Sequence, residues 1–280
     1  MRRKSREKEA VLMIIDLHTH VFPDKIAERT IGALAVKSGK PAADGTVADL
    51  RRSMRESGVD VAVNLPAITK TSQFDSTNRF AAEINGHDGI YSFGAIHPDC
   101  EDPEAKLDYI KSLGLRGIKI HPDYQQCFID DERYIRIIRY AVEIGLYVTT
   151  HAGFDNGFPE LTHCTPDRSA RMLDAVYGKS EPAEPRIIFA HLGGRGFYDG
   201  VESLLCGRNV YFDLSYVLIE NDPALTTRIV RAHGAERVVF GSDSPWRSQK
   251  DDLAREQMLG LSAAEHELIL EKNGRAILGI

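Results

Sequence analysis

Several features that mark particular protein classes are scarce in this sequence. The chain has four cysteines and no Cys-x-x-Cys pair, which is typical of reduced, structural thiols in a cytoplasmic protein. The apolar stretch from Ala10 to Ile15 is too short for a signal peptide or a membrane helix, so we expect no membrane partner. The 35 basic residues are outnumbered by 41 acidic residues, giving a net charge of −6, which argues against nucleic acid as a partner. A small molecule is the expected substrate.

A glycine-rich phosphate-binding turn is also missing after the first predicted strand, where the chain continues as HTHVFPD. An open doubly wound sheet would usually carry that turn, so its absence favours a closed barrel. No Pro-rich linker or low-complexity segment divides the 280 residues, a length that suits one α/β barrel. We predict a single domain over residues 13–280, preceded by a short basic tail at residues 1–12.

Short apolar runs alternate with amphipathic stretches along the chain, which is the pattern of repeated βα units. Strands are expected at 13–20, 60–67, 90–98, 115–122, 146–151, 186–191, 210–215 and 237–243. Helices are expected at 47–57, 75–85, 103–113, 131–144, 166–177, 200–206, 223–233 and 262–278. This order and length predict an α/β fold of the (β/α)8 TIM-barrel type, closed by the final helix.

Side chains that bind metals lie at the carboxyl ends of the predicted strands: His18, His20, His151, His191 and Asp243. A parallel barrel brings these strand ends together on the face where active sites form. His18 and His20 are two residues apart on one strand, so their side chains project to the same side. A carboxylate as close to the core as Asp243 is costly unless it is paired or bound to a metal. The set therefore predicts a metal site.

Each of these residues, taken alone, has a simpler explanation. A His-x-His pair can be two hydrogen-bonded polar residues at a strand terminus, and a lone strand-end histidine is more often a core residue than a ligand. The equivalent placement on several strands favours the metal site over these explanations.

The same residues resemble the amidohydrolase superfamily, and their flanks resemble its amidohydrolase-2 branch. The resemblance rests on the segments IDLHTHVFPD, GIKIHP, FAHLGG, VVFGSDSPW and KNGRAILGI, and it spans residues 13–280. That branch contains metal-dependent hydrolases and decarboxylases of the aminocarboxymuconate-semialdehyde type. The motifs are specific for the superfamily and do not identify a substrate.

The resemblance implies that His18, His20, His151 and Asp243 bind one metal ion. It implies that His191 binds a second ion or, beside a single ion, orients the reacting water or polarises the substrate. Many two-metal relatives place a carboxylated lysine on strand four, and Lys119 lies on that strand, on the same side as His121. The sequence leaves open whether Lys119 bridges two ions or only hydrogen-bonds near the site.

The implied cofactor is zinc, as one or two ions, with manganese or another divalent metal as an alternative. A metal-activated water would then attack an amide, ester or lactone bond. Asp243 would act as general base and acid, and His191 would help to stabilise the oxyanion. The alternative is a non-oxidative decarboxylase of an aromatic or unsaturated carboxylic acid, and a third possibility is a catalytically silent barrel that serves as a binding protein.

Candidate substrate contacts lie on the loops that follow the strands: Phe22, His121, Tyr124, Arg195 and Trp246. A guanidinium fork such as that of Arg195 matches the geometry of a substrate carboxylate, although an arginine on an exposed loop is often simply solvated. For His121, a substrate contact and a polar strand-end residue remain alternatives. A homodimer is common for barrels of this kind, and the sequence leaves the oligomeric state open.

Overall fold

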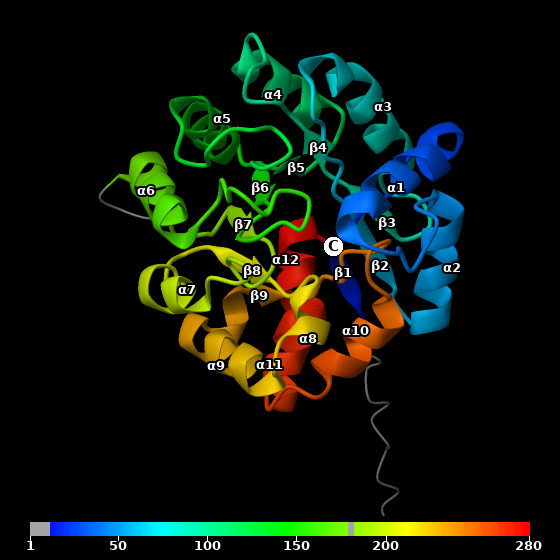
Figure 1. Ribbon diagram of the computed structural model, residues 1–280, viewed down its shortest axis with the longest axis vertical. Coiled ribbons are helices and arrows are strands. Elements are labelled where there is room, and N and C mark those ends of the chain that lie inside the picture. The colour runs from blue at the N-terminus through cyan, green and yellow to red at the C-terminus, as the bar shows by residue number, and fades with distance from the viewer. Residues whose placement is uncertain (1–11, 179–181) are drawn as a thin grey trace, which may run out of the picture.

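The computed structural model describes residues 12–178 and 182–280, so nearly all of the predicted basic tail lies outside the described residues. A ring of helices surrounds a central set of parallel strands (Figure 1). The strands are β1 (Ile15–Thr19), β2 (Val61–Asn64), β3 (Ile90–Ser92), β4 (Gly94–Ala95), β5 (Gly117–Ile120), β6 (Tyr147–Thr150), β7 (Ile187–Phe189), β8 (Tyr211–Asp213) and β9 (Val238–Val239).

The strands pair in chain order, first β1 to β3 and then β4 to β9, always in parallel. Backbone hydrogen bonds close the ring between its first and last strands. Leu17 donates its backbone N–H to the carbonyl oxygen of Phe240 at 2.9 Å, and Asp243 donates to the carbonyl oxygen of His18 at 2.8 Å. The predicted (β/α)8 barrel is therefore confirmed, with all eight predicted strand positions occupied.

The strand predicted at 90–98 is divided into β3 and β4 around Phe93. Its first part pairs with β2, and the backbone N–H of Phe93 still donates to the carbonyl oxygen of Asn64 at 3.0 Å. At Ala95 the side chain of Asn78 takes the place of the neighbouring strand. Its Oδ1 accepts from the backbone N–H of Ala95 and its Nδ2 donates to the carbonyl oxygen of Ala95, both at 2.9 Å. A side chain from α3 thus ends the pairing with β2, which alternation of residue types does not reveal.

The α-helices are α1 (Asp24–Ser38), α2 (Val47–Ser57), α3 (Phe74–Ile84), α4 (Pro103–Ser112), α5 (Glu132–Glu143), α6 (Pro166–Tyr177), α7 (Tyr198–Leu204), α8 (Val217–Glu220), α9 (Pro223–His233), α10 (Gln249–Glu256), α11 (Ala263–Glu267) and α12 (Asn273–Leu278). Short 3-10 turns span Thr71–Gln73 and Ala235–Arg237, and a π-helical turn at Leu268–Lys272 joins α11 to α12. The predicted helices are all present, whereas α1, α8 and α10 were not predicted. None of the helices in the described residues has the length and apolar character needed to cross a membrane.

Apolar side chains fill the amino-terminal end of the barrel. Ile15 and Leu17 of β1 pack in one buried cluster with Ile277 and Leu278 of α12. The close approach depends on Gly274, where a Cβ atom would lie 2.9 Å from Ile15. The last helix therefore closes the barrel at this end, as predicted, and polar residues gather at the opposite end.

Candidate metal centre and active-site pocket

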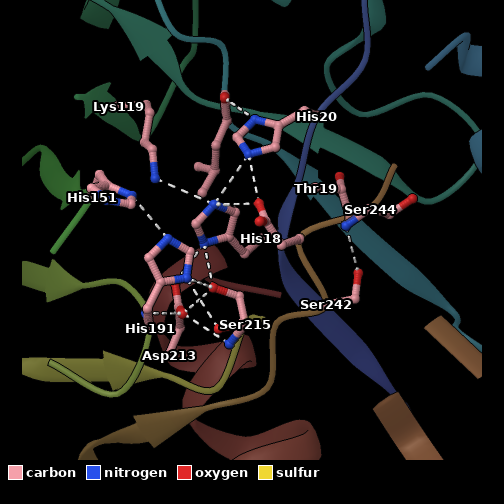
Figure 2. Close-up of polar contacts among 12 residues, drawn as sticks. His18, Thr19, His20, Lys119, His151, His191, Asp213, Ser215, Ser242 and Ser244 are labelled. Atoms are coloured by element: carbon pink, nitrogen blue, oxygen red, sulfur yellow. Dashed lines mark hydrogen bonds and ion pairs between the residues drawn. The ribbon is translucent and has the colours of Figure 1, made fainter. Parts of the chain in front are cut away.

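The predicted strand-end residues lie together at the carboxyl end of the barrel. They all line one cavity of about 910 Å³: His18, His20, His151, His191 and Asp243. Lys119, His151 and His191 project from their strands towards His18 (Figure 2). The barrel therefore brings these five residues to one cavity, and their roles as metal ligands and catalytic groups stay predictions.

Three potential ligand atoms converge at the end of β1. The Nε2 atoms of His18 and His20 lie 3.2 Å apart. Asp243 Oδ1 lies 3.3 Å from the first of these nitrogens and 3.0 Å from the second. Bonds of roughly 2.0–2.2 Å to one ion place neighbouring ligand atoms about 3 Å apart, so the spacing suits a single ion.

Hydrogen bonds on the other side of each ring determine where its proton lies. His20 Nδ1 donates to the carbonyl oxygen of Leu65 at 2.7 Å, and a carbonyl oxygen can only accept. His18 Nδ1 donates to Asp213 Oδ2, also at 2.7 Å. Both Nε2 atoms therefore carry lone pairs, and these face each other and a carboxylate oxygen. Such a donor set is repulsive by itself and fits a divalent cation.

Burial favours the neutral form of three imidazoles of the site, those of His18, His151 and His191. It lowers the pKa of His18 to about 4 and also lowers the pKa values of His151 and His191. Because only the unprotonated nitrogen can bind a metal ion, these shifts favour metal binding at neutral pH.

Asp213 and Ser215, at the end of β8, support the site and were not predicted. Asp213 Oδ1 accepts the backbone N–H groups of His191 at 2.9 Å and of Ser215 at 3.0 Å, while Oδ2 holds His18. Burial alone would raise the pKa of Asp213, but the groups around it, His18 first, hold that pKa below its usual range. The signal in the sequence was an aspartate ending a buried apolar run, as at Asp243.

His191 is held in one tautomer and in a rare backbone conformation. Its Nδ1 donates to the carbonyl oxygen of Ser215 at 3.0 Å, so its Nε2 accepts from His151 Nδ1, also at 3.0 Å. The φ angles of His191 and Asp243 are 58° and 72°, in the left-handed region that non-glycine residues seldom occupy. Strain of this kind concentrates at functional sites.

His151 belongs to a second group of potential ligands. The bond to His191 leaves its Nε2 without a proton, 3.7 Å from Asp123 Oδ2 and 3.9 Å from Asp155 Oδ2. Among the described residues, neither His151 Nε2 nor Asp123 Oδ2 has a hydrogen-bond partner, although both are buried.

The second group comprises His121, His151 and Asp155, whose ligand atoms lie within 4.8 Å of one another. His121 Nε2 lies 3.6 Å from Asp155 Oδ2. Neither Asp123 nor Asp155 was predicted from the sequence. The role of His151 as a fourth ligand beside His18, His20 and Asp243 stays a prediction.

Lys119 points into the barrel, which the sequence left open. It is 1% exposed, and its Nζ lies 3.3 Å from His18 Nε2. Burial lowers the pKa of this amine to about 8. As an ammonium, Lys119 donates to the lone pair that a metal ion would use. Its role as a carboxylated bridge stays a prediction.

The predicted substrate contacts all line the cavity: Phe22, His121, Tyr124, Arg195 and Trp246. Tyr124 stacks on the ring of His121 with their centroids 3.8 Å apart. The guanidinium of Arg195, however, makes two bonds to Glu220, at 2.6 and 2.8 Å. Because its fork already holds a carboxylate of the protein, Arg195 is a poor candidate for binding a substrate carboxylate.

Comparisons with known proteins cover nearly the whole chain. A family model described as Amidohydrolase matches residues 15–280. A search of curated proteins found no match.

Solved structures share the fold at low identity. A 2,6-dihydroxybenzoate decarboxylase from Rhizobium has a TM-score of 0.70 at 15% identity, with 96% of this chain and 99% of that chain covered. A 5-carboxyvanillate decarboxylase from Novosphingobium aromaticivorans, complexed with manganese, has a TM-score of 0.67 at 14% identity, with 97% of each chain covered. A probable 2-pyrone-4,6-dicarboxylic acid hydrolase from Acinetobacter baumannii has a TM-score of 0.68 at 16% identity, with 95% and 99% covered.

Proposed function

Because this chain belongs to the amidohydrolase-2 family, we propose that it is a divalent-metal-dependent, non-oxidative decarboxylase of an aromatic or unsaturated carboxylic acid. One observation carries the metal dependence. The Nδ1 protons of His18 and His20 are bound to acceptors, so two bare nitrogens face Asp243 at 3.0–3.3 Å. These three side chains would hold the ion.

Separate observations favour decarboxylation over hydrolysis, although the sequence favoured hydrolysis. Two of the structures with the same fold are decarboxylases of aromatic acids, and one of them contains manganese. Aromatic side chains line the cavity of this chain: Phe22, Phe80, Tyr124, Tyr216 and Trp246. Such a lining suits a flat, apolar substrate body. We favour manganese over zinc because one of these decarboxylases contains manganese.

When bound, a divalent ion would anchor an oxygen of the substrate and supply positive charge beside it. Decarboxylation replaces a carbon–carboxylate bond by a carbon–hydrogen bond, so the protein must deliver one proton as carbon dioxide leaves. Asp155 lines the cavity, and burial raises its pKa to about 6, which lets it keep a proton closer to neutral pH than an ordinary carboxyl group. We assign the proton delivery to Asp155.

Hydrolysis of an amide, ester or lactone is the second candidate, because the probable pyrone dicarboxylic acid hydrolase shares the fold to a similar degree. In that reaction Asp243 would take a proton from the attacking water and return it to the leaving group.

The four cysteines are free thiols, which supports the cytoplasmic location expected from the sequence.

Product analysis separates the candidates. Protein supplied with Mn²⁺ would be incubated with hydroxylated benzoic acids and, in parallel, with lactones, esters and amides. We expect carbon dioxide and the decarboxylated arene in equal amounts from at least one acid. Proton release from a lactone or ester without carbon dioxide would select hydrolysis, and no turnover across both panels would favour the silent barrel.

The metal assignment has its own control. His18→Ala should sharply lower the manganese content of the purified protein, while circular dichroism shows the fold retained. A variant that keeps the wild-type metal content would remove His18 from the centre.

A further inference from the structure

The cavity extends well beyond the three side chains that would hold the metal. It is also lined by Ile26, Arg29 and Ala33 of α1 and by Thr77 and Phe80 of α3. Spacings of three and four residues place these side chains on one face of each helix. The two helices lie on the same side of the barrel mouth (Figure 1). The cavity is therefore a groove that runs from the strand ends along two helix faces.

The groove is larger than a single-ring acid requires. Its volume of about 910 Å³ lies near the top of the range of roughly 300–1,000 Å³ found for pockets that hold drug-sized ligands. The lining residues of α1 from Ile26 to Leu34 extend about 12 Å along the helix axis. The lining includes Phe22, Ile26 and Phe80, which give it an apolar wall. A substrate with an apolar body longer than one ring would fill this space.

Two arginines of the groove have no partner among the residues that the structure describes. Arg29 and Arg79 line the cavity and are exposed, and within residues 12–178 and 182–280 neither makes a hydrogen bond or ion pair. Arg195, in contrast, is already bound to Glu220. Lys25 adds a third cation to the lining, against the single carboxylate of Glu83 among the groove residues of α1 and α3. The helical part of the groove is thus suited to an anion.

We propose that the substrate is an elongated dianion. One carboxylate would react at the end of the groove near His18, the apolar body would lie between α1 and α3, and a second anionic group would bind Arg29 and Arg79. This inference rests on the proposed function for the identity of the reacting group. The arginines are determinants of specificity and take no part in the reaction.

Calorimetric titration with ligands that cannot react tests the proposal. Protein supplied with Mn²⁺ would be titrated with biphenyl-4,4′-dicarboxylate, biphenyl-4-carboxylate and benzoate. We expect the dicarboxylate to bind about tenfold more tightly than the biphenyl monoacid, and benzoate to bind most weakly. The double variant Arg29→Gln/Arg79→Gln should lose the tenfold preference and keep the wild-type affinity for the monoacid.

Arg55→Gln is the matched control, because Arg55 is exposed on α2, does not line the cavity and, in the described part of the chain, is also without a partner. It should bind all three ligands as the wild type does. Equal affinities of wild type for the two biphenyl acids, or a preference that survives in the double variant, would overturn the proposal. A preference lost only in the double variant, with no carbon dioxide released from any acid, would support the groove and refute the decarboxylase.

Discussion

Asp213→Asn is the substitution that most directly tests how the metal centre is built. Asp213 Oδ1 accepts from two backbone N–H groups and from Ser215 Oγ, so an asparagine should keep its oxygen at that position. Its NH₂ group would then replace Oδ2, 2.7 Å from His18 Nδ1. A donor there forces His18 to accept at Nδ1 and to carry its proton on Nε2, where it blocks the metal.

The expected loss of manganese affinity follows from the role of hydrogen-bond partners that orient metal-binding histidines. Removing the group that orients a ligating histidine typically weakens metal binding by about 10–100-fold, or roughly 1.4–2.7 kcal/mol. The buried bond is short and charge-assisted, so we expect the upper part of this range. The fold should persist, since the substitution preserves the shape of the side chain.

Manganese affinity would be measured by calorimetric titration, and the tautomer of His18 by ¹⁵N chemical shifts of the imidazole. Glu256→Gln is the matched control, because Glu256 is an equally buried carboxylate bonded to a histidine, His266, at 2.6 Å and does not line the cavity. The control should bind manganese as the wild type does. An Asp213→Asn protein whose affinity stays within about threefold of wild type would refute the reasoning.

Three further predictions concern other carboxyl groups, those of Asp252, Asp243 and Asp155. Burial and the charge of Asp16 raise the pKa of Asp252 to about 8, and neither of its oxygens has a partner among the described residues. The protein should therefore lose stability as pH rises from about 4 to about 8. In urea unfolding, Asp252→Asn should be roughly 1–3 kcal/mol more stable than wild type at pH 8, and the gain should be smaller at pH 5. If the free energy of unfolding depends on pH in the same way in both proteins, this prediction is wrong. Asp243→Asn should abolish turnover with an unchanged circular dichroism spectrum, and activity near wild type would exclude Asp243 from the centre. Asp155→Asn should slow decarboxylation by about 10²–10⁴-fold at unchanged manganese content, and loss of the metal would instead identify Asp155 as a ligand.

Local sequence patterns were sufficient to predict the barrel and the positions of its strand ends. The helices predicted at 47–57, 166–177 and 223–233 match α2, α6 and α9, because each has a clear start signal and an apolar face. Helix α1 lacks such a start signal, because no side chain caps its first turn. Its apolar residues also divide between two sides, since Ala27 and Ile31 are buried in the core whereas Ile26 lines the cavity. The sequence of α1 therefore shows no single apolar stripe, and the helix was not predicted.

Sequence alone also placed His18, His20, His151, His191 and Asp243 at one end of the molecule, because strand period and barrel topology together decide where a strand end lies. It could not decide how these side chains divide into groups. Which nitrogen of each ring carries the proton depends on partners from other strands, such as Asp213 for His18 and His191 for His151.

Tertiary structure decided those partners, and with them the direction of Lys119 and the separate grouping of His151 with His121 and Asp155. The groove between α1 and α3 depends in the same way on two helices that are distant in sequence. The alternation of side chains along a strand determines the face on which each side chain lies. The hydrogen-bond partner of that side chain is set only when the chain closes on itself.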